Sequence, residues 1–180
     1  MTTNPDSMPS ASLQVLLDAG SIECAEPDVC TEAFVHTFCK ATLQAQSLLD
    51  LKQVSQVEVS VQVVGRDEMQ SLNRQYRQKE GATNILSFES GLPVMMLDGD
   101  EQIGGMLALG DLVLCREVID SEAREQSKSQ AAHWAHMLVH GTLHLCGYDH
   151  EEEHQASAME SLEIQLLSKA GFGNPYGSSE

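Results

Sequence analysis

A histidine-rich run near the C-terminal end constrains this chain more than any other feature of its sequence. The segment from His140 to His150 reads HGTLHLCGYDH, and its first two histidines are four residues apart. On an α-helix this spacing leaves them about 40° apart on one face, so both imidazoles can approach one metal ion. Gly147 then favours a left-handed turn that ends the helix and brings His150 back toward the ion. We therefore expect His140, His144 and His150 to bind a metal on a helix and its following loop.

The spacing of these histidines also indicates which metal and which chemistry to expect. Three imidazoles without a fourth protein ligand are typical of a catalytic zinc site, whose open position takes a water or a substrate oxygen. Zinc peptidases with this spacing carry a glutamate directly after the first histidine as general base. This chain has Gly141 at that position. The motif therefore predicts one Zn²⁺ per chain and argues against a peptidase.

Acidic side chains outnumber basic ones by 27 to 10, which gives the chain a formal net charge of −17. Taken alone, this charge argues against a protein that holds nucleic acid through many phosphate contacts. Four of the basic residues nevertheless gather in one short segment: Arg66, Arg74, Arg77 and Lys79. Taken by itself, this cluster is better explained as a solvated helix face than as a binding surface.

Length and composition predict a soluble protein of one domain. The chain has 180 residues, of which 42% are hydrophobic, and this suits a single core. It has no apolar stretch near the roughly 20 residues that span a bilayer, and residues 1–11 do not resemble a signal peptide. Five cysteines without a disulfide pattern fit a reducing compartment. We therefore expect a cytoplasmic protein that makes no contact with a membrane.

Apolar periodicity predicts both strands and helices. Valines alternate with polar residues from Val57 to Val63, as in a strand with one polar face. Further strands are expected at 13–17, 84–88 and 106–115, and helices at 27–49, 117–126, 129–145 and 152–170, with a short helix that begins at an Asp67 cap and ends near Arg77. This order predicts an α+β fold with a four-stranded mixed sheet and about five helices. We expect residues 1–10 to be disordered, 11–176 to form the domain and 177–180 to be a tail.

Several segments of the chain resemble the YbeY endoribonuclease family of ribosomal RNA maturation factors. They are Leu72–Lys79 (LNRQYRQK), Thr83–Phe88 (TNILSF), Leu109–Cys115 (LGDLVLC), His133–His136 (HWAH), the histidine run itself and Asn174–Tyr176 (NPY). The resemblance implies a zinc-dependent endoribonuclease that cleaves single-stranded RNA in ribosomal RNA maturation and ribosome quality control. It also implies that the three histidines bind the metal and that Arg77 is functional. The chain departs from the family at Glu89, where proline is common, and at Gly81-Ala82.

Arg77 and Asp149 are the candidate catalytic residues. Phosphodiester cleavage gathers negative charge on the phosphate oxygens, and a guanidinium beside a metal ion stabilises that charge. Asp149 is placed to orient or deprotonate a nucleophile, although a hydrogen bond to a metal ligand or a helix cap would also explain it. His136, one turn before His140, is expected to be a buried structural histidine or a hydrogen-bond donor to the site.

Thr83, Asn84 and Ser87 are expected to line the substrate groove or to support the edge of a strand. Two other functions stay open. A zincin-like metallopeptidase would need a glutamate base near the metal, and a non-catalytic ribosome assembly factor with a structural metal would suit the acidic surface. The expected partners are single-stranded RNA, in particular ribosomal RNA, and a small-subunit particle or its proteins.

Overall fold

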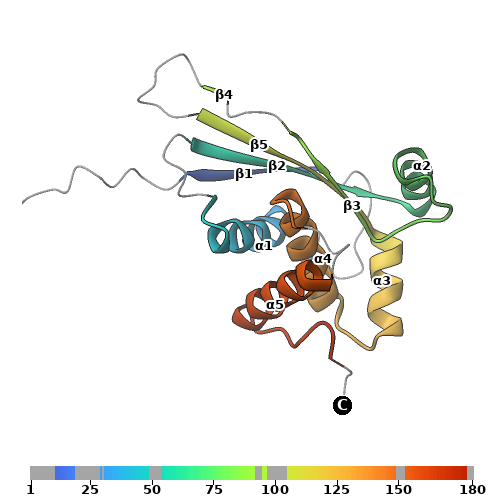
Figure 1. Cartoon of the computed structure of the whole chain (residues 1–180). Coiled ribbons are helices and arrows are strands. Elements are labelled where there is room, and N and C mark those ends of the chain that lie inside the picture. The colour runs from blue at the N-terminus through green and yellow to red at the C-terminus, as the bar shows by residue number, and fades with distance from the viewer. Residues whose placement is uncertain are drawn as a thin grey trace, which may run out of the picture.

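The computed structural model describes residues 11–18, 29, 31–48, 54–91, 95–96, 105–148 and 153–177. Its strands are β1 (Ser12–Asp18), β2 (Val54–Val64), β3 (Ile85–Glu89), β4 (Met95–Met96) and β5 (Gly105–Cys115). Its helices are α1 (Glu32–Ala45), α2 (Arg66–Arg77), α3 (Arg116–Glu125), α4 (Gln130–Leu145) and α5 (Glu153–Lys169) (Figure 1). The predicted single α+β domain with a mixed sheet is confirmed: in the described residues four strands follow one hydrogen-bonded path, the two-residue β4 adds a fifth strand beside β5, and there are five helices.

The sheet has the strand order β1-β2-β5-β3, in which the first three strands are parallel and β3 runs antiparallel to β5. The short β4 pairs with the first residues of β5, beyond the end of β3. The alternating valines of β2 are all buried, as the period of two predicted. Among the strands that the structure describes, β3 is an edge strand, so one side of its backbone pairs with none of them.

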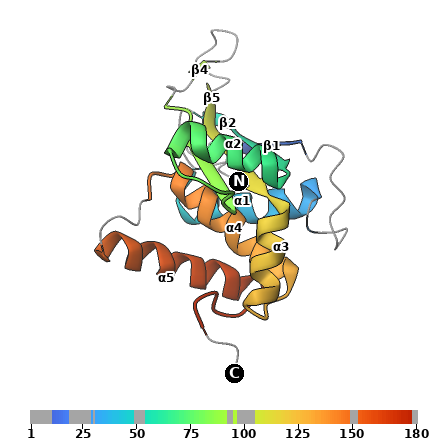
Figure 2. The same cartoon turned by 90° about the vertical axis from the view of Figure 1, so that its right-hand side faces the viewer.

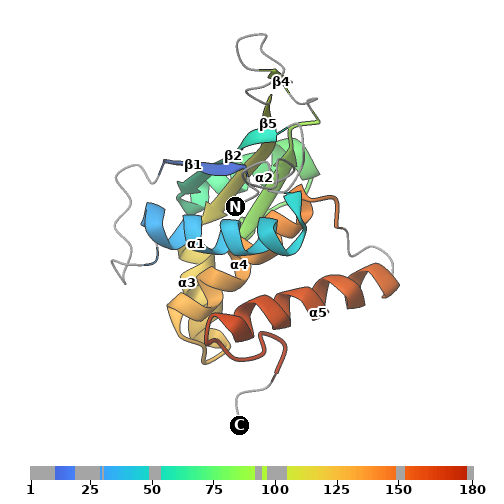
Figure 3. The same cartoon turned by 90° about the vertical axis from the view of Figure 1, so that its left-hand side faces the viewer.

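The helices form a layer on one face of the sheet, except for α2 (Figure 1). α1 and α4 lie directly beneath the strands, and α5 packs on α4 farther from the sheet (Figures 2 and 3). The main core fills the space between the sheet and this layer. A second, smaller core cluster lies between the other face and α2, and it contains Val64, Met69, Leu86, Val113 and Cys115. None of the helices that the structure describes has the length and apolar character needed to cross a membrane.

Neighbouring residues of β3 therefore belong to different cores. Ile85 packs into the main core, beneath the sheet, whereas Leu86 packs into the cluster under α2. This follows from the alternation of side chains along a strand. β3 thus joins the layer that contains α4 to the layer that contains α2.

The start of α2 differs from the prediction. Asp67 was expected to cap this helix, but the N-cap is Gly65, which has extended backbone angles and makes no side-chain cap. The difference arises because β2 continues to Val64, so the chain enters the helix directly from the strand. Asp67 instead lies in the first turn, where its negative charge favours the positive end of the helix dipole.

Candidate metal centre and active site

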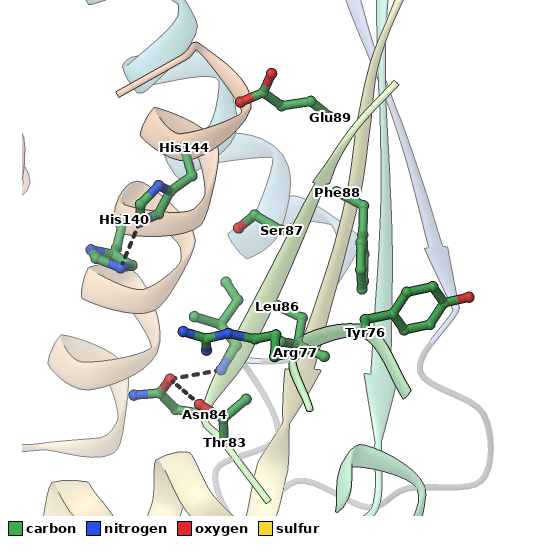
Figure 4. Close-up of a pocket in the computed structure, with 11 residues that line it drawn as sticks. Tyr76, Arg77, Thr83, Asn84, Leu86, Ser87, Phe88, Glu89, His140 and His144 are labelled. Atoms are coloured by element: carbon green, nitrogen blue, oxygen red, sulfur yellow. Dashed lines mark hydrogen bonds between the residues drawn. The ribbon is translucent and has the colours of Figure 1, made fainter. Parts of the chain in front are cut away.

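Helix α4 brings His140 and His144 together, as their spacing predicted. Their Nε2 atoms are 3.2 Å apart (Figure 4). Two nitrogen ligands at 2.0–2.1 Å from a tetrahedral zinc ion would be separated by about 3.3 Å. The two imidazoles therefore have the geometry of neighbouring ligands on one metal ion.

The turn after α4 is also as predicted. Gly147 has a φ of +85°, in the left-handed region that glycine favours. The Gly147 and Tyr148 amides donate to the carbonyls of His144 and Leu143, at 2.9 and 3.1 Å. This is the hydrogen-bond pattern of a Schellman motif, which ends the helix and reverses the chain. Asp149 and His150 lie outside the described residues, so their roles stay predictions.

Glu163 of α5 is a buried carboxylate that contacts the ring nitrogen of His140 that faces away from His144. Its Oε1 atom lies 2.8 Å from His140 Nδ1, and its Oε2 atom lies 3.2 Å from His136 Nε2 and accepts a further hydrogen bond from the Tyr176 hydroxyl. Burial alone would raise the pKa of Glu163, but hydrogen bonds from His136, His140 and Tyr176 lower this pKa to about 2. The carboxylate is thus an acceptor that places the proton of His140 on Nδ1 and leaves the Nε2 lone pair for a metal.

His136, His140 and Glu163 also form a group that can hold a metal ion, since their ligand atoms all lie within 4.8 Å of one another. An ion bound there would replace the protons that now join the two imidazoles to the carboxylate. It would therefore compete with the hydrogen bonds that orient His140 toward His144. His136 itself is buried, and burial lowers its pKa in spite of the neighbouring carboxylate.

The histidine pair opens onto a pocket of about 690 Å³ between α4, β3 and the end of α2. Arg77, the last residue of α2, is exposed and reaches across the pocket toward the histidines (Figure 4). In the part of the chain that the structure describes, no carboxylate pairs with Arg77. The guanidinium is therefore available to an anionic ligand in the pocket.

Thr83, Asn84 and Ser87 line this pocket, as expected. The Asn84 amide donates to the Glu122 carboxylate at 3.1 and 3.3 Å, and Glu122 contacts His133 Nε2 at 2.8 Å. The Ser87 hydroxyl donates to the Gly141 carbonyl at 3.4 Å. These contacts fix the wall of the pocket to α3 and α4.

A side chain at position 141 would require its packed neighbours to shift. A Cβ atom on Gly141 would lie 2.4 Å from Ile85 Cδ1 and 2.9 Å from Leu112 Cδ2. A glutamate next to the first histidine, as in the peptidase motif, would therefore displace these side chains, because α4 lies directly on the sheet there. Glu89, at the end of β3, is the acidic residue that lines the pocket in the described part of the chain.

A family model described as Endoribonuclease YbeY matches residues 22–171. The chain belongs to this family. The predicted family is therefore confirmed, and so is the predicted class of enzyme, an endoribonuclease that hydrolyses phosphodiester bonds.

Individual relatives agree with the family model. An Endoribonuclease YbeY from Cellvibrio japonicus is 48% identical over 128 residues, covering 71% of this chain and 68% of that protein. One from Pseudomonas putida is 40% identical over 158 residues, covering 88% of this chain and 90% of the relative. The solution structure of TM1509 from Thermotoga maritima matches 92% of this chain and 99% of its own, at 21% identity and a TM-score of 0.48.

Glu163 is one of the residues of the site that sequence reasoning missed. It lies in an apolar stripe at helical spacing, together with Met159, Leu162, Leu166 and Leu167. A carboxylate at a core position needs buried partners, and this was the signal available in the sequence. Tyr76 and Phe88 were also missed, although both line the pocket.

Proposed function

We propose that this chain is a zinc-dependent endoribonuclease that cleaves single-stranded RNA in ribosomal RNA maturation and ribosome quality control. The observation that carries the proposal is the pair of Nε2 atoms, 3.2 Å apart, in the same pocket as Arg77. Membership of the YbeY family supports the reaction class. The remaining steps concern the metal ligands, the arginine and the RNA.

His140, His144 and His150 are the proposed zinc ligands. The contacts of Glu163 favour this set over the buried group of His136, His140 and Glu163, because three hydrogen bonds already occupy the carboxylate oxygens. Three imidazoles also leave an open position toward the pocket. When bound, the zinc ion polarises a phosphoryl oxygen or lowers the pKa of a water.

Arg77 is the proposed stabiliser of the scissile phosphate. Its planar guanidinium can donate two parallel hydrogen bonds to the non-bridging oxygens, which gain negative charge in the transition state. Asp149 stands between the second and third proposed ligands in the sequence, and its proposed role is to orient or deprotonate the nucleophile.

Single-turnover cleavage of a single-stranded RNA, with and without a chelator, tests the proposal. We expect cleavage that the chelator abolishes and Zn²⁺ restores, with about one zinc per chain by elemental analysis. His144→Ala should lose the zinc. Arg77→Lys should keep the zinc but cleave RNA more slowly than wild type, because the point charge of lysine replaces the planar guanidinium. Arg74→Lys is the matched control, since Arg74 lies in the same helix but pairs with Glu80 at 3.3 Å. Full zinc content in His144→Ala would contradict the ligand assignment.

A role in ribosome assembly alongside RNA cleavage is the second candidate, and the net charge of −17 favours it. An acidic surface can meet basic ribosomal proteins by complementary charge. Binding to small-subunit particles that persists with the chelator present, when cleavage has stopped, would support this role alongside the enzyme activity. We propose that the small-subunit particle or its proteins are partners in either case.

A further inference from the structure

Tyr76 is a large aromatic residue that the fold leaves in solvent. Its side chain is 57% exposed, although it belongs to the last turn of α2 and lines the same pocket as the histidines. No hydrogen bond holds its hydroxyl in the part of the chain that the structure describes. Tyr176, another exposed aromatic residue, differs because its hydroxyl donates to Glu163.

Phe88 braces the Tyr76 ring. The two ring centroids are 4.9 Å apart at an interplanar angle of 65°, which is a favourable edge-to-face contact. Phe88 in turn packs on the small core cluster under α2. The phenol is therefore held at its position while more than half of its surface stays accessible. A rigid aromatic surface of this kind can accept a ligand with little loss of side-chain entropy.

Tyr76 lies on the path that a nucleic acid strand would take away from the site. The histidines and Tyr76 lie on opposite sides of β3, and the Arg77 side chain lies between them (Figure 4). The pocket continues from the histidines around the free edge of β3 to Tyr76. A strand with a phosphate beside Arg77 would carry a neighbouring nucleotide over this edge toward the Tyr76 ring.

The acidic charge of the chain favours a contact of this kind, which does not depend on phosphate binding. The net charge is −17, and within the basic segment Arg74 pairs with Glu80. We therefore expect few phosphate contacts and a contribution to RNA affinity from another source. Stacking on an aromatic ring tolerates any base, but a base in a duplex is already stacked on its neighbours.

We propose that Tyr76, braced by Phe88, stacks against one unpaired nucleobase that flanks the cleaved bond, and that this contact selects single-stranded RNA. The inference rests on the proposed endoribonuclease function and adds a base-binding subsite to it. Tyr76 acts on binding and does not touch the reacting phosphate. Its loss should therefore raise KM and leave kcat nearly unchanged.

Tyr76→Leu and Tyr76→Phe test the subsite in the full-length, zinc-loaded protein. With a short single-stranded RNA, Tyr76→Leu should raise KM roughly tenfold or more, whereas Tyr76→Phe, which keeps the ring, should stay near wild type. Leu16→Ser is the matched control, because Leu16 is 44% exposed but lines a different hollow. Thermal unfolding of each variant checks that the fold is intact.

A set of RNAs with one abasic site each, moved along the strand, locates the base. Wild type should lose affinity at one position, and Tyr76→Leu should lose nothing further there. An unchanged KM in Tyr76→Leu, or an equal additional loss at every abasic position, would overturn the inference while the endoribonuclease function stands. Wild-type protein that neither binds nor cleaves RNA would overturn the proposed function and the subsite together.

Discussion

Gly141→Ala should destabilise the protein, although alanine is ordinarily the better helix residue by about 1 kcal/mol. The added Cβ would lie 2.4 Å from Ile85 Cδ1 and 2.9 Å from Leu112 Cδ2. Carbon atoms make favourable contact only from about 3.5 Å. Overpacking of this kind costs about 1–3 kcal/mol. The net result should be a loss of about 1 kcal/mol in the free energy of unfolding.

Thermal unfolding of wild type, Gly141→Ala, Ile85→Val and the double variant measures this clash directly. A loss of about 1 kcal/mol lowers the melting temperature of a chain of this size by about 2–4 °C. Ile85→Val removes the nearest atom and should cost about 1 kcal/mol alone. Combined with Gly141→Ala it should cost much less, because the space it opens receives the new Cβ. The coupling energy of this double-mutant cycle should be about 1 kcal/mol.

Leu86→Val is the matched control for this cycle, because Leu86 is buried on the other face of the same strand. Its cost should add to that of Gly141→Ala. A higher melting temperature for Gly141→Ala, or an additive result with Ile85→Val, would show that α4 can move from the sheet at no cost. The steric account of the missing glutamate would then be wrong.

The contacts of two buried or half-buried carboxylates and the charge of the chain lead to three further expectations. Glu163→Gln should weaken zinc binding about 10–100-fold in competition with a chelator, whereas the exposed Glu160→Gln should not; equal affinities would refute the orienting role of Glu163. Burial raises the pKa of Glu122, but hydrogen bonds from His133 and Asn84 bring it below the ordinary 4.5. Glu122 therefore stabilises the fold above that pH and loses this contribution as the pH falls. The free energy of unfolding of Glu122→Gln should accordingly change less than that of wild type between about pH 5 and about pH 3, and parallel curves would contradict this. For naked single-stranded RNA, the logarithm of the binding constant should fall with the logarithm of the salt concentration with a slope of about −3 or shallower, at roughly −0.7 per neutralised phosphate. A steeper slope would reveal a larger basic surface.

Local patterns predicted most of the fold and the proximity of His140 and His144, whereas the full set of metal ligands stays a prediction. The alternating valines of β2 and the spacing of His140 and His144 are properties of short segments, and each specifies one structure through its period. The left-handed turn at the end of α4 could be predicted for the same reason, because glycine is the residue that such a turn favours and Gly147 stands at that point. The start of α2 was predicted wrongly because Asp67 is a good cap by itself, whereas the actual start depends on where β2 ends.

Contacts between distant segments could not be predicted in this way. His140 meets Glu163 across 23 residues, and only the packing of α5 on α4 makes them neighbours. The absence of a glutamate at position 141 correctly argued against a peptidase. The steric reason for a glycine there depends on the contact of α4 with β3 and β5, which the sequence does not show. The brace between Tyr76 and Phe88 joins a helix to a strand in the same manner.

The two halves of the site belong to different layers, and β3 is what joins them. The histidines are on α4, which is held on the sheet at Gly141 and on α5 through Glu163. Arg77 comes from α2, which packs on the opposite face of the sheet. The separation of Arg77 from the histidines therefore depends on how tightly both helices pack on β3. For this reason Gly141→Ala should slow RNA cleavage by more than its loss of stability explains, even where the protein stays folded and keeps its zinc, and Ile85→Val should restore the rate along with the stability.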